Sequence, residues 1–390
     1  MKKNIFAVLL VTVLLAMTFA GCQTAGDEDA IRFGGLAPLT GKLSEYGNAA
    51  NNGIKMAIDE INAAGGILGK KITYKVYDEK GDVSEAVTNF DRLVNDDKIQ
   101  IFIGDVTSTP TLAVAERAAQ VGIPMITATG TNADITKAGS NVFRTCFTDP
   151  YQGELMANYA VKKLSAKTAA VLYDATDDYS KGCRDSFKAA AEKLGMTVVA
   201  DEAYNAGAVD FSAQLTKIAG QNPDVFFIPV YYEDVAKIAV QAKDKNITAK
   251  MLGADGWDGV LSKLTDATYS AVEGIYFCGH YSAESQDEKV VNFIKKYTET
   301  YGSAPNMFAA LGYDAAYMMA DAIKNAGSVD YTAVCNAMKD LKFDGVTGHI
   351  VFDENRNPIK PGAITTIQLG QDEDGKTTAS YKFVESFSVE

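Results

Sequence analysis

The 390-residue chain has few of the residues from which metal and redox centres are built. It contains 5 Cys and 2 His, and Cys146, Cys183, Cys278 and Cys335 stand far apart without a C-x-x-C spacing. Metal-binding and dithiol motifs rely on closely spaced ligands. The sequence therefore predicts no metal and no cofactor. It leaves open whether these four cysteines form disulfides or are buried as small hydrophobic side chains.

An excess of positive charge is also missing. Lys and Arg total 37 against 50 Asp and Glu, which gives a formal net charge of -13. A protein that binds nucleic acid phosphates needs a basic face. Nucleic acid is therefore not an expected partner, and the acidic surface mainly serves solubility.

Sequence motifs of nucleotide-binding and hydrolytic enzymes are absent. The glycines after the first expected strand, in 34–41, do not have the G-x-G-x-x-G spacing, and neither a Walker A nor a G-x-S-x-G motif occurs. His280 and His349 are far apart and are more typical of structural or exposed side chains than of a general base. The pair Asp177-Asp178 is typical of a solvated turn. The sequence therefore does not predict an enzyme.

The amino terminus has the three-part pattern of a secretory signal peptide. Lys2 and Lys3 precede an apolar run over 5–19, which is short for a membrane-spanning helix, and Ala20-Gly21-Cys22 follows. This ending resembles the bacterial lipoprotein signal, which implies removal of 1–21 and a diacylated Cys22. Residues 22–30 are then a polar tether, and the expected localisation is extracytoplasmic and lipid-anchored. A membrane helix and secretion without lipid are the alternatives.

A unit of strand, turn and amphipathic helix recurs through the remaining chain. After a strand expected over 31–36, Ile54, Ala57, Ile58 and Ile61 occupy one face of a helix expected over 46–64. Such alternation is typical of parallel sheets covered by helices on both faces. The length favours two domains. The predicted fold class is α/β, with two doubly wound parallel-sheet lobes joined by a hinge.

Polar and aromatic side chains follow several expected strands, and ligands of open α/β sheets bind beyond these strand ends. A helix start such as that near 108 can hold a carboxylate without Arg, although it can equally be a helix cap without a ligand. An amino acid also needs an anion for its ammonium group and an apolar wall for its side chain. The first half of the chain offers hydroxyls and the second half offers aromatic rings and one carboxylate. The candidates are Ser108, Thr131, Tyr179, Tyr231 and Asp255.

Several segments have the sequence characteristics of one family. They are 35–41, 57–67, 102–104, 107–109, 130–132, 143–145, 178–182, 210–212 and 313–315. Through them the chain resembles the leucine/isoleucine/valine-binding protein family, the type I periplasmic substrate-binding proteins of ABC importers. The resemblance covers nearly all of the chain after the tether. It implies one lobe of 31–147 and 282–354, and a second of 148–281 and 355–390.

The resemblance implies roles for residues of the first lobe. Ser108 and Thr131 match hydroxyls that hold the carboxylate and amino groups of the ligand, and Gly130 offers its backbone. Tyr46 matches an aromatic position near the side-chain pocket. The disulfide familiar from this lobe is missing here, because no Cys pair brackets the loop.

In the second lobe the resemblance implies that Tyr179 and Tyr231 close over the ligand and that Asp255 pairs with its α-ammonium. Branched-chain-specific members can have Glu at the position of Asp255, so the shorter side chain leaves the identity of the ligand open. Relatives bind aliphatic amino acids, but also amides, urea and aromatic acids.

The resemblance implies a function outside the cytoplasm. The chain is expected to be a solute-binding lipoprotein of an ABC importer, to bind a branched-chain or other aliphatic amino acid between its lobes, and to act as a monomer. Its expected partners are the ligand, ABC permease subunits and, through Cys22, the membrane. The alternatives are a ligand-sensing module of the same fold and an importer component for an amide, urea or an aromatic acid.

Overall fold

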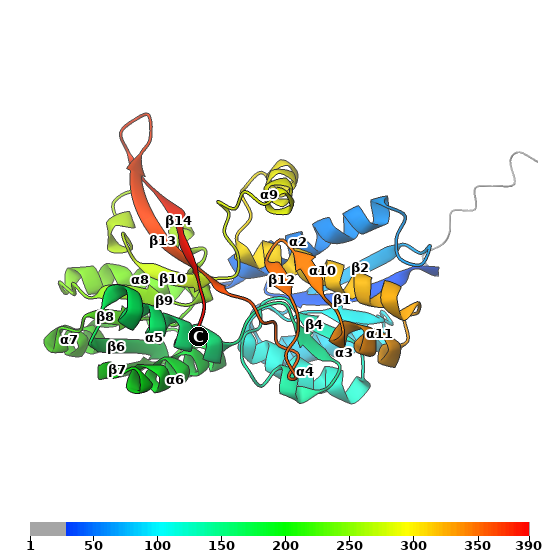
Figure 1. Ribbon diagram of the computed structural model, residues 1–390, viewed down its shortest axis with the longest axis horizontal. Coiled ribbons are helices and arrows are strands. Elements are labelled where there is room, and N and C mark those ends of the chain that lie inside the picture. Colours follow the sequence, from blue (N-terminus) through cyan, green and yellow to red (C-terminus); the bar gives the residue numbers. More distant parts are fainter. Residues whose placement is uncertain (1–28, 390) are drawn as a thin grey trace, which may run out of the picture.

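The computed structural model of the protein describes residues 29–389 (Figure 1). The predicted signal peptide (1–21), Cys22 and the tether up to residue 28 lie outside the described residues. Between residues 29 and 389, no helix is long and apolar enough to cross a membrane.

The first lobe is built on a five-stranded parallel sheet. Strand β1 pairs on both sides, with Phe33 opposite Tyr74 of β2 and Ile101 of β3. Strand β3 is buried throughout because helices cover both faces of the sheet. In spatial order the strands are β2 (Ile72–Asp78), β1 (Ile31–Ala37), β3 (Ile101–Ile103), β4 (Met125–Thr127) and β5 (Val142–Arg144). Its early helices are α2 (Ser44–Ala63), α3 (Val83–Asn95), α4 (Ser108–Val121) and the short η2 (Thr136–Ala138).

The second lobe is built on a seven-stranded sheet. Its strands in spatial order are β14 (Thr377–Phe387), β13 (Gly362–Gln371), β10 (Tyr276–Gly279), β9 (Lys250–Gly253), β8 (Val225–Phe227), β6 (Thr168–Asp174) and β7 (Thr197–Tyr204). Its helices are α5 (Asp149–Leu164), α6 (Asp178–Lys193), α7 (Ser212–Gln221), α8 (Tyr232–Asp244) and the short η3 (Asp255–Trp257), η4 (Val260–Lys263) and η5 (Tyr269–Ala271). The predicted α/β fold with two parallel-sheet lobes is confirmed. The hairpin β13–β14 is antiparallel and was not predicted from the strand–helix alternation.

Three late helices lie between β10 and β13 in the chain and are labelled in Figure 1: α9 (Glu288–Tyr301), α10 (Met307–Ala326) and α11 (Tyr331–Lys339). Helix α10 packs against α2 of the first lobe. The two helices approach closely because glycines lie in the contact. A Cβ atom built on Gly53 would lie 2.0 Å from the carbonyl oxygen of Ala309, and one on Gly312 would lie 2.3 Å from that of Ala50. Beyond α11, strands β11 (Phe343–Gly345) and β12 (Gly348–Ile350) form a small antiparallel sheet.

The chain crosses between the two lobes after β5, after β10 and before β13. The connecting residues 145–148, 280–287 and 358–361 are called the crossing segments below. The first lobe occupies the right of Figure 1 and the second lobe the left, with the crossing segments between them.

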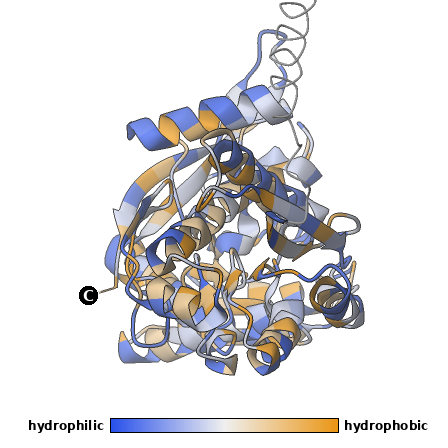
Figure 2. Cartoon of the chain, turned by 90° about the vertical axis from the view of Figure 1, so that its right-hand side faces the viewer, coloured by the Kyte–Doolittle hydropathy of each residue, from blue (hydrophilic) through white to orange (hydrophobic). Residues whose placement is uncertain are grey.

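Apolar side chains fill both lobes and the contact between them. Along several helices hydrophobic and hydrophilic residues alternate (Figure 2), as expected of helices that bury one face. One cluster of buried residues spans the two lobes and contains Tyr46 and Phe308 of the first together with Trp257 of the second. Continuous apolar packing of this kind holds the lobes together in a closed arrangement.

The cysteines of the described chain are buried and unbonded: Cys146, Cys183, Cys278 and Cys335. Burial raises the pKa of Cys146 to about 12, so this thiol stays protonated. The interpretation of these side chains as small buried hydrophobic groups is confirmed.

Candidate functional site

The predicted carboxylate-binding hydroxyls meet at the start of α4. Ser108 is the first residue of that helix, and its Oγ lies 3.5 Å from Oγ1 of Thr131. The backbone N–H of Asn132 donates to Ser108 Oγ over 3.2 Å. Both hydroxyls are buried, at 1% and 2% exposure. A helix start with two hydroxyls beside it can donate several hydrogen bonds to one carboxylate.

Gly130 lies beside them with both backbone groups engaged. Its N–H donates to Thr127 Oγ1 over 2.9 Å, and its carbonyl oxygen accepts from the buried guanidinium of Arg144 over 2.9 Å. A Cβ atom at this position would lie 2.8 Å from Thr127 Oγ1. The structure therefore gives Gly130 a packing role, and its binding of a ligand stays a prediction.

Tyr46 extends from α2 into the second lobe. Its hydroxyl donates to the carbonyl oxygen of Gly256 over 2.5 Å and accepts from the N–H of Tyr232 over 3.1 Å. Its ring stacks on Phe308 with centroids 4.2 Å apart. Burial raises the pKa of the Tyr46 phenol, so it remains a hydrogen-bond donor.

Tyr179 and Tyr231 form a stacked pair in the second lobe, with ring centroids 4.9 Å apart and an interplanar angle of 10°. The Tyr179 hydroxyl accepts from the N–H of Gly256 over 2.9 Å, and the ring of Tyr231 meets Tyr46 edge-on at 5.7 Å. The structure thus brings all three predicted tyrosines together. They can supply the apolar wall that an amino-acid side chain needs.

Asp255 begins η3, separated from the end of β9 by Ala254, and its side chain is buried. Its Oδ2 lies 3.0 Å from Nε2 of His280. Its backbone N–H donates to Oε1 of Gln152 over 2.9 Å. Oδ2 is therefore engaged, and no hydrogen bond to Oδ1 is found in the part of the chain that the structure describes.

Hydrogen bonds also join the lobes at the start of α6. The N–H of Asp178 donates to Thr109 Oγ1 over 3.2 Å, and the amide of Asn132 donates to the carbonyl oxygen of Asp178 over 3.2 Å. Asp177 caps α6 by accepting from the N–H of Ser180. Burial raises the pKa of Asp177 to about 6. The interpretation of Asp177-Asp178 as a solvated turn was wrong, because the pair lies at the contact between the lobes.

The structure adds residues that the sequence reasoning missed: Asp149, Gln152, His280 and Phe308. Asp149 is fully buried and its N–H donates to the carbonyl oxygen of Thr131 over 2.9 Å. Burial raises the pKa of Asp149, and a hydrogen bond with Thr131 opposes that rise. His280 directly follows β10, which ends at Gly279. The apolar run over 274–281 predicts a longer strand that encloses His280, so the rule that ligands bind beyond strand ends did not single it out.

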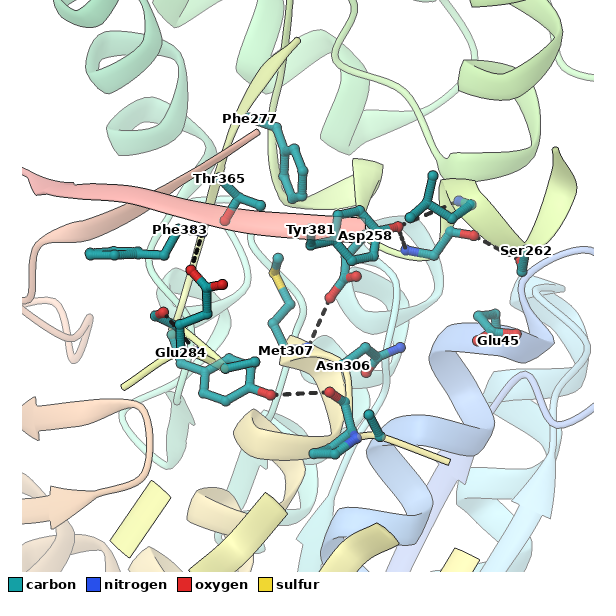
Figure 3. Close-up of a pocket in the computed structure, with 17 residues that line it drawn as sticks. Glu45, Asp258, Ser262, Phe277, Glu284, Asn306, Met307, Thr365, Tyr381 and Phe383 are labelled. Atoms are coloured by element: carbon teal, nitrogen blue, oxygen red, sulfur yellow. Dashed lines mark hydrogen bonds between the residues drawn. The ribbon is translucent and has the colours of Figure 1, made fainter. Parts of the chain in front are cut away.

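A cavity of about 280 Å³ adjoins the site and receives residues from both lobes (Figure 3). Glu45, Asn306 and Met307 line it from the first lobe, while Asp258 and Tyr381 line it from the second. The backbone N–H of Met307 donates to Oδ2 of Asp258 over 2.8 Å, drawn as a dashed line in Figure 3. Two of its lining residues, Glu45 and Met307, are chain neighbours of the site residues Tyr46 and Phe308. None of the predicted ligand residues lines the cavity.

The assembled groups fit a zwitterion better than a uniformly charged ligand. Hydroxyls and a helix start lie on one side, and a buried carboxylate with one available oxygen lies on the other. Aromatic rings lie between the lobes and can contact an apolar side chain. Such an arrangement can hold and orient a small molecule without a reacting group.

Comparison with known proteins agrees with this geometry. The family described as periplasmic binding protein matches residues 30–376. The Leu/Ile/Val-binding protein BraC3 of Rhizobium johnstonii is 33% identical over 337 residues, which cover 86% of this chain and 89% of that protein.

Two solved structures share the fold. The branched-chain amino acid transporter substrate-binding protein LivJ of Streptococcus pneumoniae, in complex with isoleucine, is 33% identical with a TM-score of 0.81, over 91% of this chain and 100% of that one. A solute-binding protein of R. palustris in complex with benzoate is 22% identical with a TM-score of 0.80, over 93% and 98% of the two chains. The chain belongs to the leucine/isoleucine/valine-binding protein family of periplasmic binding proteins, which are extracytoplasmic substrate-binding components of ABC importers and not enzymes.

Proposed function

We propose that the protein binds an amino acid with a branched or other aliphatic side chain and presents it to an ABC permease. The observation that carries this proposal is the buried Asp255 carboxylate, whose Oδ2 lies 3.0 Å from His280 Nε2 and whose Oδ1 has no hydrogen bond within residues 29–389. A buried carboxylate is stabilised by a cationic partner, and an α-ammonium supplies one. The similarity to a Leu/Ile/Val-binding protein and to an isoleucine complex supports the same ligand class.

In the proposed complex the ligand carboxylate lies at the start of α4, where Ser108 and Thr131 donate to it. Its ammonium group lies at Asp255, and its side chain contacts Tyr46, Tyr179 and Tyr231. Because these groups come from both lobes, a ligand that binds them all favours the closed arrangement over an open one. The permease would then recognise the closed form.

An aromatic acid is the second candidate, since a relative of the same fold binds benzoate. The buried Asp255 argues against it, because a benzoate has no cation to offset that charge. A sensing module and an importer component for an amide or urea use the same fold and remain outcomes of the test below.

We further propose that the lobes comprise 31–147 with 282–354 and 148–281 with 355–390, and that the protein is a monomer anchored through a diacylated Cys22. The Ala20-Gly21-Cys22 pattern supports the anchor. Mass spectrometry of the protein from bacterial membranes would detect the lipid on Cys22. A Cys22→Ala variant is expected to appear in the soluble fraction, and membrane retention of that variant would contradict the anchor.

The test of the ligand is a thermal-shift screen followed by calorimetric titration. The domain beginning after residue 28 is refolded to remove carried-over ligand and is then mixed with amino acids, their amides, urea or benzoate. A ligand that binds only the folded protein raises the melting temperature. A rise with leucine, isoleucine, valine or alanine supports the proposal. A rise only with benzoate, an amide or urea would replace it.

A further inference from the structure

A histidine lies between the predicted ammonium anchor and the crossing segments. His280 is the first residue of crossing segment 280–287, and its Nε2 lies 3.0 Å from Oδ2 of Asp255. Its ring stacks on Phe147 of crossing segment 145–148, with centroids 3.8 Å apart. The side chains of His280 and Asp255 are only 0% and 4% exposed. Two of the three crossing segments therefore contact each other at the group that holds this carboxylate.

The ionisation of Asp255 decides which nitrogen of His280 carries the proton in this hydrogen bond. An ionised carboxylate only accepts hydrogen bonds, so the bond to Asp255 requires a proton on Nε2 of His280. Burial, the largest cause, lowers the pKa of His280 to about 4. The imidazole is therefore neutral near pH 7, with its lone pair on Nδ1. A neutral donor holds the carboxylate without cancelling its negative charge, so that charge remains for a ligand cation.

The backbone around Asp255 is fixed by other contacts. Gln152 accepts from the N–H of Asp255, and the Tyr179 hydroxyl accepts from the N–H of Gly256. These contacts locate the backbone but do not choose the rotamer of the carboxylate. The bond to His280 Nε2 does so, because it engages one oxygen of the side chain.

We propose that His280 is the positioning residue that aims the Asp255 carboxylate at the ammonium group of the ligand and ties this anchor to the crossing segments. This inference rests on the proposed amino-acid function. His280 then contributes to selectivity for ligands that carry an ammonium group. It does so through Asp255 and does not contact the ligand itself. Separation of the lobes would move the crossing segments and disturb the anchor, which links ligand release to opening.

The test compares two substitutions and two ligands. His280→Leu removes the donor at similar size, and His280→Gln keeps an N–H donor. The probes are L-leucine and 4-methyl-2-oxopentanoate, which has the same carbon skeleton without the ammonium group. Hydrogen bonds to charged groups contribute enough that His280→Leu is expected to weaken leucine about ten- to a hundredfold. The oxo acid should bind His280→Leu as it binds the wild type, and His280→Gln should recover most of the leucine affinity.

Equal weakening of both probes in His280→Leu would assign His280 a structural role and overturn the inference. Unchanged leucine affinity would overturn it as well. If the wild type binds neither leucine nor another amino acid, the proposed function fails first and the inference fails with it. Should His280→Leu not fold, ¹⁵N NMR of the wild type with leucine bound decides: a neutral imidazole protonated on Nε2 is expected, and a charged or Nδ1-protonated ring would contradict the geometry.

Discussion

The hydroxyl of Tyr46 lies 2.5 Å from the carbonyl oxygen of Gly256, although 210 residues separate them in the chain. The same hydroxyl accepts from the N–H of Tyr232. A single side chain of the first lobe thus satisfies two backbone groups of the second. Both hydrogen bonds exist only while the lobes are together, so they stabilise the closed arrangement and not either lobe alone.

Removal of this hydroxyl is expected to favour separation of the lobes. Tyr46→Phe keeps the ring against Phe308 but leaves the Gly256 carbonyl and the Tyr232 N–H without this partner. The cost is about 1–3 kcal/mol, paid in the closed form only, and leucine affinity should fall accordingly. Calorimetric titration measures the affinity, and solution X-ray scattering should show a larger radius of gyration without ligand.

Tyr317→Phe is the matched control, because the Tyr317 hydroxyl donates to Glu60 Oε2 within the first lobe. Its loss should leave ligand affinity unchanged. Equal effects of the two substitutions would show that the Tyr46 hydroxyl has no special part in closure.

Loss of the Asp255 charge is expected to weaken an amino-acid ligand strongly. Asp255→Asn preserves shape and leaves the ligand ammonium without an anion, at a cost of about 2–5 kcal/mol. Titration with leucine measures the change, and Glu192→Gln, which neutralises an exposed carboxylate on α6, is the control. Affinity that is the same for Asp255→Asn and Glu192→Gln would remove Asp255 from the site.

The contact between α2 and α10 is expected to tolerate no added methyl group. In Gly53→Ala the new Cβ would lie 2.0 Å from the Ala309 carbonyl oxygen, so the helices must move apart at a cost of about 1–3 kcal/mol. Gly220→Ala in α7 is the control, because nothing lies within 4 Å of its added Cβ. That substitution should stabilise the protein by about 0.5–1 kcal/mol. Urea unfolding measures the free energy of unfolding of both variants. A Gly53→Ala variant as stable as the wild type would contradict the close contact between α2 and α10.

Asp258 is expected to make stability depend on pH with a definite sign. Burial, opposed by the hydrogen bond from the Met307 N–H, raises the pKa of Asp258 to about 6. The folded state then binds more protons than the unfolded state between pH values of about 4 and 6. The stability that this group contributes is therefore present below about pH 4 and is lost as the pH rises through about 6.

Asp258→Asn removes this titration and keeps an oxygen that can accept from Met307. The difference in unfolding free energy, wild type minus variant, should fall by about 2–3 kcal/mol from pH 4 to pH 7. Urea unfolding of both proteins at intervals of one pH unit measures it. Other buried acids, such as Asp105 and Asp177, are common to both proteins and cancel. A difference that does not vary with pH would contradict the raised pKa.

Local sequence patterns predicted most of the fold. Strand Thr197–Tyr204 has the bounds that its β-branched run predicts, because the preference for extended structure is local. Short buried strands were predicted too long: the strand expected over 225–231 ends at Phe227. Apolar runs continue past the last ladder bond into buried loops, so periodicity alone does not locate a strand end. Strand β14 was missed because its polar, half-exposed residues resemble a loop.

The predicted site residues are brought together, but the contacts that hold them could not be predicted. Ser108 and Thr131 followed from the rule about strand ends. The bond between Asp255 and His280 could not, because the strand expected over 274–281 enclosed the histidine, whereas β10 ends at Gly279. Pairs such as Tyr46 and Gly256 depend on how the two lobes meet, which no local pattern encodes. The role of each predicted residue in ligand binding stays a prediction until titrations are made.

The late elements have a consequence for the order of folding. Helix α10 completes the cover of the first sheet, and strands β13 and β14 complete the second. A nascent chain released from the ribosome only as far as residue 287 would lack α10 over the first sheet and the outer strands β13 and β14 of the second. Most multidomain chains fold their amino-terminal domain first as synthesis proceeds. Here neither lobe can complete its fold before the other. The nascent polypeptide therefore remains accessible to chaperones during the roughly 5–20 s of synthesis that supply the remaining segments.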